Sequence, residues 1–336
     1  MPARNVADPH RRALLAGFSL WLASAPRAAG GVAPPGPAAA TAATAATSAI
    51  ATTATTTATA ATPATRPIPS TGERLPVVGL GSWITFNVGR DRIARDACAD
   101  VMRAFFEAGG RLIDSSPMYG SSQAVIGDGL ARLGPAAPAF AADKVWISPG
   151  ARGPGQIEAS HRLWNVPRFD LLQVHNLLAW EEHLPTLLAM KAAGWLRYVG
   201  ITTSEGRRHR EIEEVMRSQP IDFVQLSYNL LDREAEQRLL PLARERGIAV
   251  IANRPFRQGE LLHSLQRHPL PPWAAEIGCD GWAQFALKFV VSHPAVTCAI
   301  PATSSVAHVK QNMGAASGRM PDAAMRQRMA AHVEAL

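Results

Sequence analysis

The sequence has few of the residues that build cross-linked or metal-bound domains. It holds 3 cysteines among 336 residues, and no two of them have the CxxC spacing. Its 10 histidines form no HExxH pattern. An odd number of cysteines without that spacing argues against a disulfide framework and against a zinc site. We therefore predict no structural metal, and we interpret Cys98 and Cys298, which lie among apolar residues, as core residues.

Charge is also scarce, at 18% of the chain against roughly 25% in typical globular domains. Much of the shortage comes from one tract: between Arg27 and Arg66 no charged residue occurs, and nearly every residue is Ala, Thr, Pro or Gly. Such a tract cannot bury enough surface to offset its ordering entropy. We expect residues 30–70 to be a disordered linker.

The charge that is present is mostly balanced locally, despite a net charge of +7 and a pI of about 9.9. Arginines are scattered and usually stand near acidic residues. The exception, residues 207–210, opens a helix-like stretch. We interpret it as a solvated helix face, with anion binding as the alternative. We predict no nucleic-acid partner.

No apolar run near the N-terminus reaches the roughly 20 residues that a membrane anchor needs. Arg11 and Arg12 precede a shorter apolar run, residues 13–25, which ends in small residues. This pattern resembles a twin-arginine (Tat) signal peptide, and we assign it to residues 1–29. It predicts export to the periplasm with no membrane association beyond export itself. Whether the leader is cleaved or is retained as a membrane anchor stays open. The alternative is a non-functional, alanine-rich leader and a cytoplasmic protein.

From residue 73 onward, short apolar runs alternate with helix-like segments. Spacings of three and four residues between apolar positions mark the helical segments, for example residues 98–108 and 282–291. The expected strands are residues 77–80, 112–114, 145–148, 171–175, 198–201, 223–226, 249–252 and 298–300.

Alternation of strands and helices predicts a parallel α/β sheet, and eight such units favour a closed (β/α)8 TIM barrel over residues 73–336. An open doubly wound sheet is the alternative. That fold normally carries a Gly-rich dinucleotide loop, and residues 78–82 match its pattern only in part. Several expected strands end in polar residues, where a barrel places its active site. These residues are Asp114, His175, Thr202, Thr203, Gln225 and Asn253.

Several of these segments resemble the aldo-keto reductase family when they are taken in order. The segment Gly79-Leu80-Gly81-Ser82-Trp83 is similar to the family's first strand, and residues 112–120, LIDSSPMYG, to its second strand and catalytic loop. Residues 170–176, 200–202, 225–229 and 300–312 match later segments. The resemblance spans roughly residues 73–320.

The resemblance implies an NAD(P)-dependent oxidoreductase that reduces a small aldehyde or ketone. It assigns Tyr119 as the proton donor. It assigns Asp114 as the carboxylate that pairs with a lysine beside that tyrosine. It leaves His175 either to orient the substrate carbonyl or to share in proton relay. A tyrosine has a reference pKa of about 10, so the family places a lysine beside it.

That lysine is missing from the position where the resemblance places it. It ends the third strand in the family, and the matching position here is Gly150 or a small deletion. Lys144 precedes the expected strand, which would place it at the opposite end of the barrel. Without the cation, an impaired or inactive reductase is expected. The alternative is a non-catalytic nicotinamide-nucleotide-binding or interaction module, and lyase or isomerase chemistry is a further one.

The family resemblance also implies the cofactor site. It assigns cofactor contacts to Thr202, Thr203, Gln225, Asn253, Phe256, Thr303, Ser304, His308 and Asn312. Many members grip the adenosine 2′-phosphate with a Lys and an Arg, at positions that correspond here to Ala302 and His308. We expect NADP, with NAD possible because those two cations are absent. The sequence indicates no oligomeric state.

Overall fold

The computed structural model describes residues 62–336. The predicted leader (1–29) and most of the predicted linker (30–70) lie outside these residues. The end of that linker is ordered, because β1 (Thr65–Pro67) pairs in antiparallel register with β2 (Arg74–Pro76). The linker boundary at residue 70 is therefore wrong: Ile68 is fully buried and anchors this segment to the barrel.

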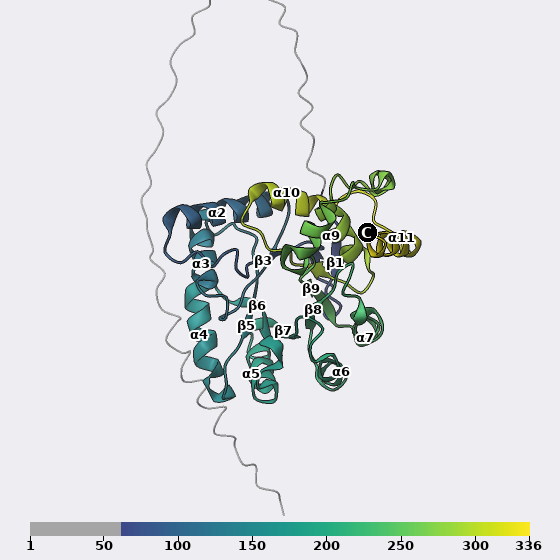
Figure 1. Cartoon of the computed structure of the whole chain (residues 1–336). Helices are drawn as coiled ribbons and strands as arrows, with labels where there is room; N and C mark the ends of the chain where they lie inside the picture. The colour runs from purple at the N-terminus through teal and green to yellow at the C-terminus, as the bar shows by residue number, and fades with distance from the viewer. Residues whose placement is uncertain (1–61) are drawn as a thin grey trace, which may run out of the picture. The chain divides into compact units, whose positions relative to one another are not determined.

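Parallel strands occupy the centre of the molecule (Figure 1). Each of them pairs with the next along the chain, in the order β10-β9-β8-β7-β6-β5-β4-β3. Bridges from Val78 to Ala299 and from Gly81 to Ala302 join the two ends of the sheet. The predicted (β/α)8 barrel is confirmed. Its strands are β3 (Leu80–Gly81), β4 (Leu112–Asp114), β5 (Phe140–Val145), β6 (Phe169–Val174), β7 (Leu196–Thr202), β8 (Phe223–Ser227), β9 (Ala249–Asn253) and β10 (Cys298–Ala299).

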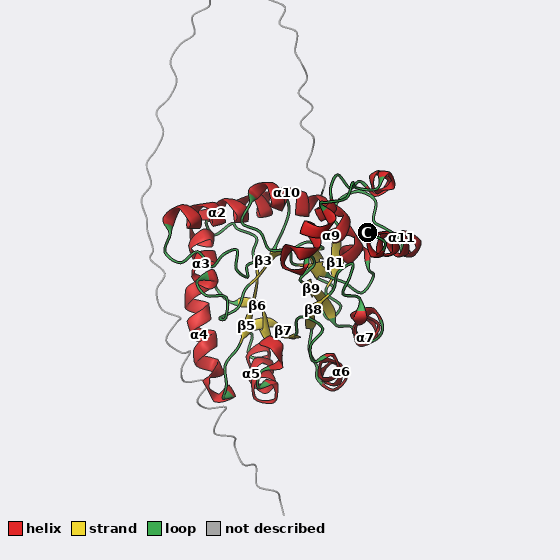
Figure 2. Ribbon diagram, viewed as in Figure 1, coloured by secondary structure: helices red, strands yellow, loops and turns green. Residues whose placement is uncertain are grey.

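Helices surround these strands, as the red ribbons around the yellow arrows in Figure 2 show. Their apolar stripes face the sheet; in α2, for example, Val101, Met102 and Phe105 are buried. The helices are α2 (Arg92–Glu107), α3 (Ser122–Leu133), α4 (Gly153–Trp164), α5 (Trp180–Ala192), α6 (His209–Ser218), α7 (Leu239–Arg246), α8 (Glu260–Leu265), α9 (Trp282–Ser292), α10 (Val306–Gly314) and α11 (Ala323–Glu334).

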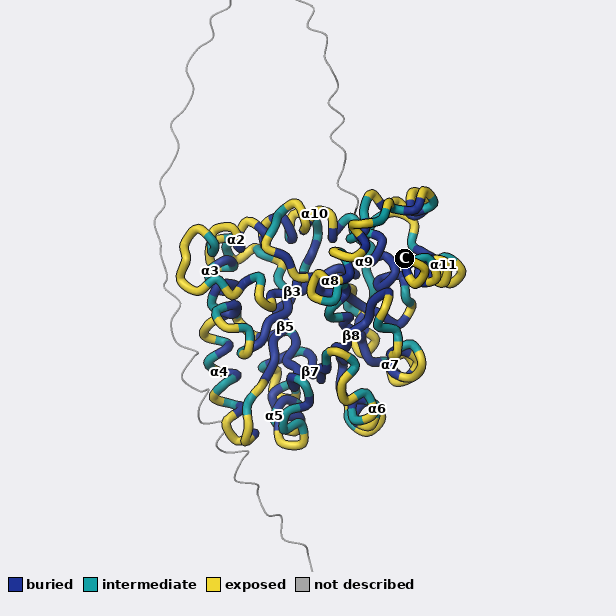
Figure 3. Tube along the Cα trace, viewed as in Figure 1, coloured by how far each residue is buried: buried dark blue, intermediate teal, exposed yellow. Residues whose placement is uncertain are grey.

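Side chains from alternate strand positions fill the barrel interior, because successive residues of a strand point to opposite faces. Figure 3 shows the strands as the dark blue, buried centre of the fold. The hairpin of β1 and β2 closes one end. Its Glu73 accepts a hydrogen bond of 2.8 Å from the Tyr198 hydroxyl near the start of β7. The interior cluster consists of Ile68, Leu75, Leu112, Phe140, Ala142, Leu171, Tyr198, Phe223, Ala249, Ile251, Cys298 and Ile300.

One strand prediction is wrong. The third barrel strand is β5, residues 140–145, and not residues 145–148. The β-branched and aromatic residues after Lys144 gave the stronger strand signal. In the structure, β5 instead uses two alanines, Ala141 and Ala142, which pair with Ile113 and Asp114 of β4.

The basic run at residues 207–210 lies at the start of α6, where Arg208 and Arg210 pair with Glu211 and Glu214. These pairs favour the solvated helix face over anion binding. Among the described residues, no helix combines the length and apolar character that crossing a membrane requires.

Candidate active site

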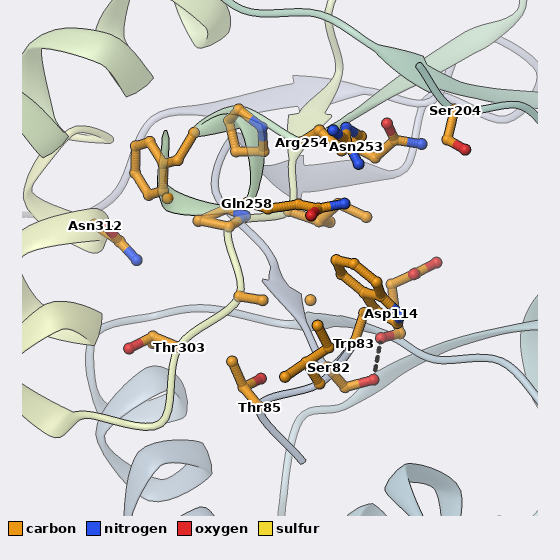
Figure 4. A pocket seen from close by; sticks show the side chains of 18 of the residues that line it. Ser82, Trp83, Thr85, Asp114, Ser204, Asn253, Arg254, Gln258, Thr303 and Asn312 are labelled. Atoms are coloured by element: carbon orange, nitrogen blue, oxygen red, sulfur yellow. Dashed lines mark hydrogen bonds between the residues drawn. The ribbon is translucent and has the colours of Figure 1, made fainter. Parts of the chain in front are cut away.

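A pocket of about 820 Å³ opens at the carboxyl ends of the barrel strands. Figure 4 shows Asn253, Arg254 and Gln258 on one side of it and Ser82, Trp83 and Thr85 on the other. A barrel fold places its active site at this end, because each strand delivers a loop there. Of the residues predicted for the site, only Ser304 does not line the pocket; those that do are Asp114, Tyr119, His175, Thr202, Thr203, Gln225, Asn253, Phe256, Thr303, His308 and Asn312.

A buried ion pair lies at the base of this pocket. The Nζ atom of Lys144 donates to Oδ2 of Asp114 at 2.5 Å and to the Ser115 carbonyl oxygen at 2.8 Å. Lys144 is fully buried and Asp114 is 2% exposed. On the other carboxylate oxygen, Gln225 donates at 2.9 Å and Gln173 at 3.4 Å. Such a pair is stable only when the remaining polar atoms are also hydrogen-bonded, as they are here.

The expectation that this chain lacks the lysine is therefore wrong. Lys144 lies inside β5, so it points into the barrel on the same side as Ala142 and reaches Asp114. Gly150 lies beyond the strand, in a short 3-10 helix (Gly150–Arg152). A Cβ atom at Gly150 would come within 2.4 Å of the Glu182 Cβ, so a lysine there would require Glu182 to shift.

Tyr119 lies beside this pair, with the Lys144 Nζ 4.9 Å from the centre of its ring. Burial raises the pKa of Tyr119, and the positive charge of Lys144 opposes that rise. Burial alone would lower the pKa of Lys144, but the negative charges of Asp114 and of an ionised Tyr119 raise it above its usual value. Lys144 therefore stays protonated and stabilises negative charge on the Tyr119 oxygen.

His175 forms the opposite side of this cluster. Its ring lies 5.8 Å from that of Tyr119, edge-on, and 6.4 Å from that of Trp146. Burial, followed by the charge of Lys144, lowers the pKa of His175 to about 2. The imidazole is therefore neutral at any pH at which the protein is studied, and it can donate or accept a hydrogen bond without carrying charge.

The rim around this cluster is apolar and accessible. Trp83, Ile84, Met118 and Trp146 are all exposed large hydrophobic residues, and they follow β3, β4 and β5. Exposed apolar side chains that gather at a pocket entrance mark a binding surface. They provide an apolar surface beside the Tyr119 and His175 side chains.

Several residues predicted to touch the cofactor are held by other protein groups. Gln225 donates to Asp114, and Asn253 donates to the Thr203 carbonyl at 2.9 Å and accepts from Ser227 at 2.7 Å. The Thr202 hydroxyl accepts from the Asn176 amide at 3.0 Å. Gln225, Asn253 and Thr202 all line the pocket, but their polar atoms mainly form hydrogen bonds that link the ends of the strands.

The end of the pocket near α10 is different. Asn312 is 5% exposed and lines the pocket, and its side-chain amide has no hydrogen-bond partner among residues 62–336. Thr303 accepts from the Ser305 amide at 3.1 Å, and Ser305 caps α10. Ser304 is exposed and lies outside the pocket. The amide of Asn312 is thus available to a ligand.

Sequence reasoning missed Lys144, Ser116 and Gln173 as residues of this site. The sequence carried one partial signal for Lys144: it stands two positions after Ala142, so both side chains share a face of any strand that contains them. The pairing of Ala142 with Asp114, which turns that face toward the barrel interior, is seen only in the structure. Ser116 and Gln173 carried no signal, since their roles depend on contacts between β4, β6 and the loops that follow them.

A model of the aldo/keto reductase family matches residues 77–332. The chain belongs to the aldo/keto reductase family. It is 31% identical over 245 residues to the methylglyoxal reductase YeaE of Escherichia coli (strain K12), a match that covers 71% of this chain and 84% of that protein. An NADH-specific methylglyoxal reductase of the same organism is 26% identical over 239 residues, covering 61% of this chain and 71% of the relative.

Solved structures share the aldo/keto reductase fold. The holo form of the aldo-keto reductase AKR11C1 from Bacillus halodurans superposes with a TM-score of 0.67 at 22% identity, covering 81% of this chain and 96% of that one. An aldo/keto reductase from Klebsiella pneumoniae, in complex with NADP and acetate, gives 0.65 at 23% identity, with 78% and 93% covered. These likenesses concern the fold. The arrangement of the catalytic cluster is observed in this structure and is not taken from the relatives. The cluster consists of Asp114, Tyr119, Lys144 and His175.

Asp143, the residue before this lysine, is a second buried carboxyl group. It points away from the barrel interior, toward α3 and α4. Its Oδ2 accepts from Gln123 at 2.6 Å and from Trp164 at 2.9 Å. Its Oδ1 has no partner among the described residues. Burial raises the pKa of Asp143 to about 7, against bonds to Lys144 and Gln123 that lower it.

This shift predicts a pH-dependent stability. Because the pKa of Asp143 is higher in the folded state, the fold favours the protonated carboxyl, and stability falls as the pH rises from about 4 to about 7. Over some three pH units the loss amounts to about 4 kcal/mol. Asp143→Asn lacks this titration, so urea unfolding at pH 5 and pH 8 should show the variant gaining stability relative to wild type. A difference that is the same at both pH values would contradict the shift.

Proposed function

We propose that this chain is an NAD(P)H-dependent reductase of small aldehydes or ketones with a complete catalytic set. The observation that carries the proposal is the buried Asp114–Lys144 pair beside Tyr119 at the base of an accessible pocket. Relatives named as methylglyoxal reductases support a small carbonyl compound as substrate. The apolar rim supports a substrate with an apolar part.

The proposed roles of Tyr119, Lys144 and Asp114 follow from their charges. As the carbonyl is reduced, negative charge develops on its oxygen, and Tyr119 is the group that donates a proton to it. Lys144 stabilises the phenolate that remains, and Asp114 keeps Lys144 protonated and in place. A bound dihydronicotinamide supplies the hydride.

The pocket fits such a cofactor. Its volume of about 820 Å³ lies within the range of ligand pockets, and it extends from Asp114 to α10. The unpartnered amide of Asn312 offers a donor and an acceptor to a base, and the backbone amides at the start of α10 favour phosphate. We therefore propose that Asn312 and Thr303 hold the adenosine half and that His175 lies beside the reacting half.

The alternative is a non-catalytic nucleotide-binding module on the same barrel. Its motivation was the absence of the lysine, and the position of Lys144 removes that motivation. It remains an outcome of the experiment below, in which a nucleotide would bind without turnover.

Lys144→Met should reduce kcat for a small aldehyde by roughly 100-fold or more, because the Tyr119 phenolate loses its cation. Cofactor affinity should change little, since Lys144 does not line the pocket. Steady-state NADPH oxidation and fluorescence titration would measure the two effects. Wild-type protein that binds NADPH but reduces no carbonyl in a broad panel would favour the non-catalytic module.

The matched control is the double variant Lys144→Met/Asp114→Asn. Removing the lysine alone leaves a buried carboxylate unpaired, at a cost of about 3–5 kcal/mol. The double variant removes that charge as well, so its thermal stability should recover while its activity stays low. If activity recovers along with stability, Lys144 has a structural role only.

Cofactor choice depends on the segment after β10. Ala302 and His308 offer no fixed positive charge, so we propose that NADPH and NADH are used with little discrimination. Introducing Ala302→Lys and His308→Arg should tighten NADPH binding by roughly tenfold to a hundredfold relative to NADH, because even one charge-assisted hydrogen bond contributes about 1.5–3 kcal/mol. Titration with both nucleotides measures the ratio, and an unchanged ratio would refute this account of the segment.

Export remains a proposal based on the leader sequence. The pair Arg11-Arg12 ahead of a short apolar run is typical of a Tat signal, which exports folded proteins and so would let a cofactor travel bound. The variant Arg11-Arg12→Lys-Lys should accumulate in the cytoplasm of the host. Cell fractionation that finds both forms in the same compartment would exclude the Tat route.

A further inference from the structure

Ser116 contacts His175 across the base of the pocket. The two residues come from different parts of the fold, Ser116 from the loop after β4 and His175 from the first position after β6. The Ser116 Oγ lies 2.8 Å from the His175 Nδ1. Ser116 is fully buried and His175 is 6% exposed, so water does not compete freely for this bond.

The remaining bonds of Ser116 decide which atom is the donor. Its Oγ already accepts a hydrogen bond from the Met118 amide at 3.3 Å. The hydroxyl proton needs an acceptor of its own, and among the described residues the His175 Nδ1 is the one within reach. The hydroxyl therefore donates, and Nδ1 is the unprotonated nitrogen of the ring.

The other ring nitrogen follows from the charge state. A neutral imidazole with an unprotonated Nδ1 carries its proton on Nε2. Burial and the nearby Lys144 charge keep the pKa of His175 low, so the ring is neutral. Because Nδ1 is turned toward Ser116 and His175 lines the pocket, Nε2 is the nitrogen that faces the ligand.

We propose that Ser116 is a positioning residue, which fixes His175 as the Nε2–H tautomer so that this N–H donates a hydrogen bond to the substrate carbonyl oxygen. The inference rests on the proposed reductase function. It assigns His175 to orienting the carbonyl, because a neutral N–H is far too weak an acid to give up its proton. The opposite tautomer would place a nitrogen lone pair against the carbonyl oxygen and repel it.

The first test reads the tautomer directly and needs no activity. The full chain is labelled with ¹⁵N-histidine, and the His175 signals are assigned by their loss in His175→Asn. Two-bond ¹H–¹⁵N correlations should show a protonated Nε2 and an unprotonated Nδ1 in the wild type. In Ser116→Ala they should shift toward a tautomer mixture. A protonated Nδ1 in the wild type, or an unchanged pattern in Ser116→Ala, would overturn the proposal.

The second test is kinetic and has a matched control. Ser116→Ala should lower kcat/KM for the carbonyl substrate on the order of tenfold while NADPH affinity is unchanged, since one directed hydrogen bond is lost. Ser122→Ala is the control. Ser122 is also fully buried, and its hydroxyl lies 3.0 Å from the hydroxyl of Ser115, the residue that precedes Ser116. Ser122→Ala should leave kcat/KM near wild type.

Restoring the hydroxyl separates positioning from packing. Ser116→Thr should recover both the Nε2–H signal and kcat/KM. If Ser116→Ala and Ser122→Ala lose the same factor in kcat/KM, the loss is a packing effect and the proposal is refuted. If no carbonyl is reduced by any form, the proposed function fails, but the NMR pattern still decides whether Ser116 sets the tautomer.

Discussion

The fully buried ion pair of Lys144 and Asp114 is the constraint on which the candidate site depends. Two charges removed from water cost several kcal/mol each, and only close geometry with further hydrogen bonds offsets that cost. Here the further bonds come from Ser115, Gln173 and Gln225. The participants stand on or directly after β4, β5, β6 and β8, so the pair is favourable only once the barrel has closed around it. The site and the fold therefore form together.

Strand register is what brings these groups to one point. Side chains alternate along β5, so Ala142 and Lys144 face the interior while Asp143 faces the helices. A slip of one residue would turn Lys144 outward and bring Asp143 against Asp114, placing two carboxyl groups together. The small side chains of Ala141 and Ala142 give this strand little β-propensity of its own. Pairing with β4 and β6 on both sides determines where it lies.

The role of strand pairing explains which features could be predicted from the sequence and which could not. Barrel topology follows from periodicity and from the alternation of strands and helices, and the polar strand ends locate the pocket. The error at Lys144 arose because strand propensity favours the β-branched and aromatic residues after it, whereas tertiary pairing selects residues 140–145. Likewise, the Asn253 side chain occupies a pocket position as expected, but only the three-dimensional contacts show that Thr203 and Ser227 already engage it.

The charges of the site point to one mobile proton. Asp114 lies 2.5 Å from the Lys144 ammonium, and the carboxylate helps to keep Lys144 protonated. His175 is neutral, and its exchangeable proton is fixed by the bond to Ser116. In the proposed reaction, this leaves the Tyr119 hydroxyl, among the described groups that face the pocket beside this pair, as the one that can release a proton to a developing alkoxide. Lys144 supports that release, while the burial of Tyr119 retains the proton until charge appears on the substrate oxygen. In the proposed reaction, proton transfer is thereby coupled to the reduction of the carbonyl and does not precede it.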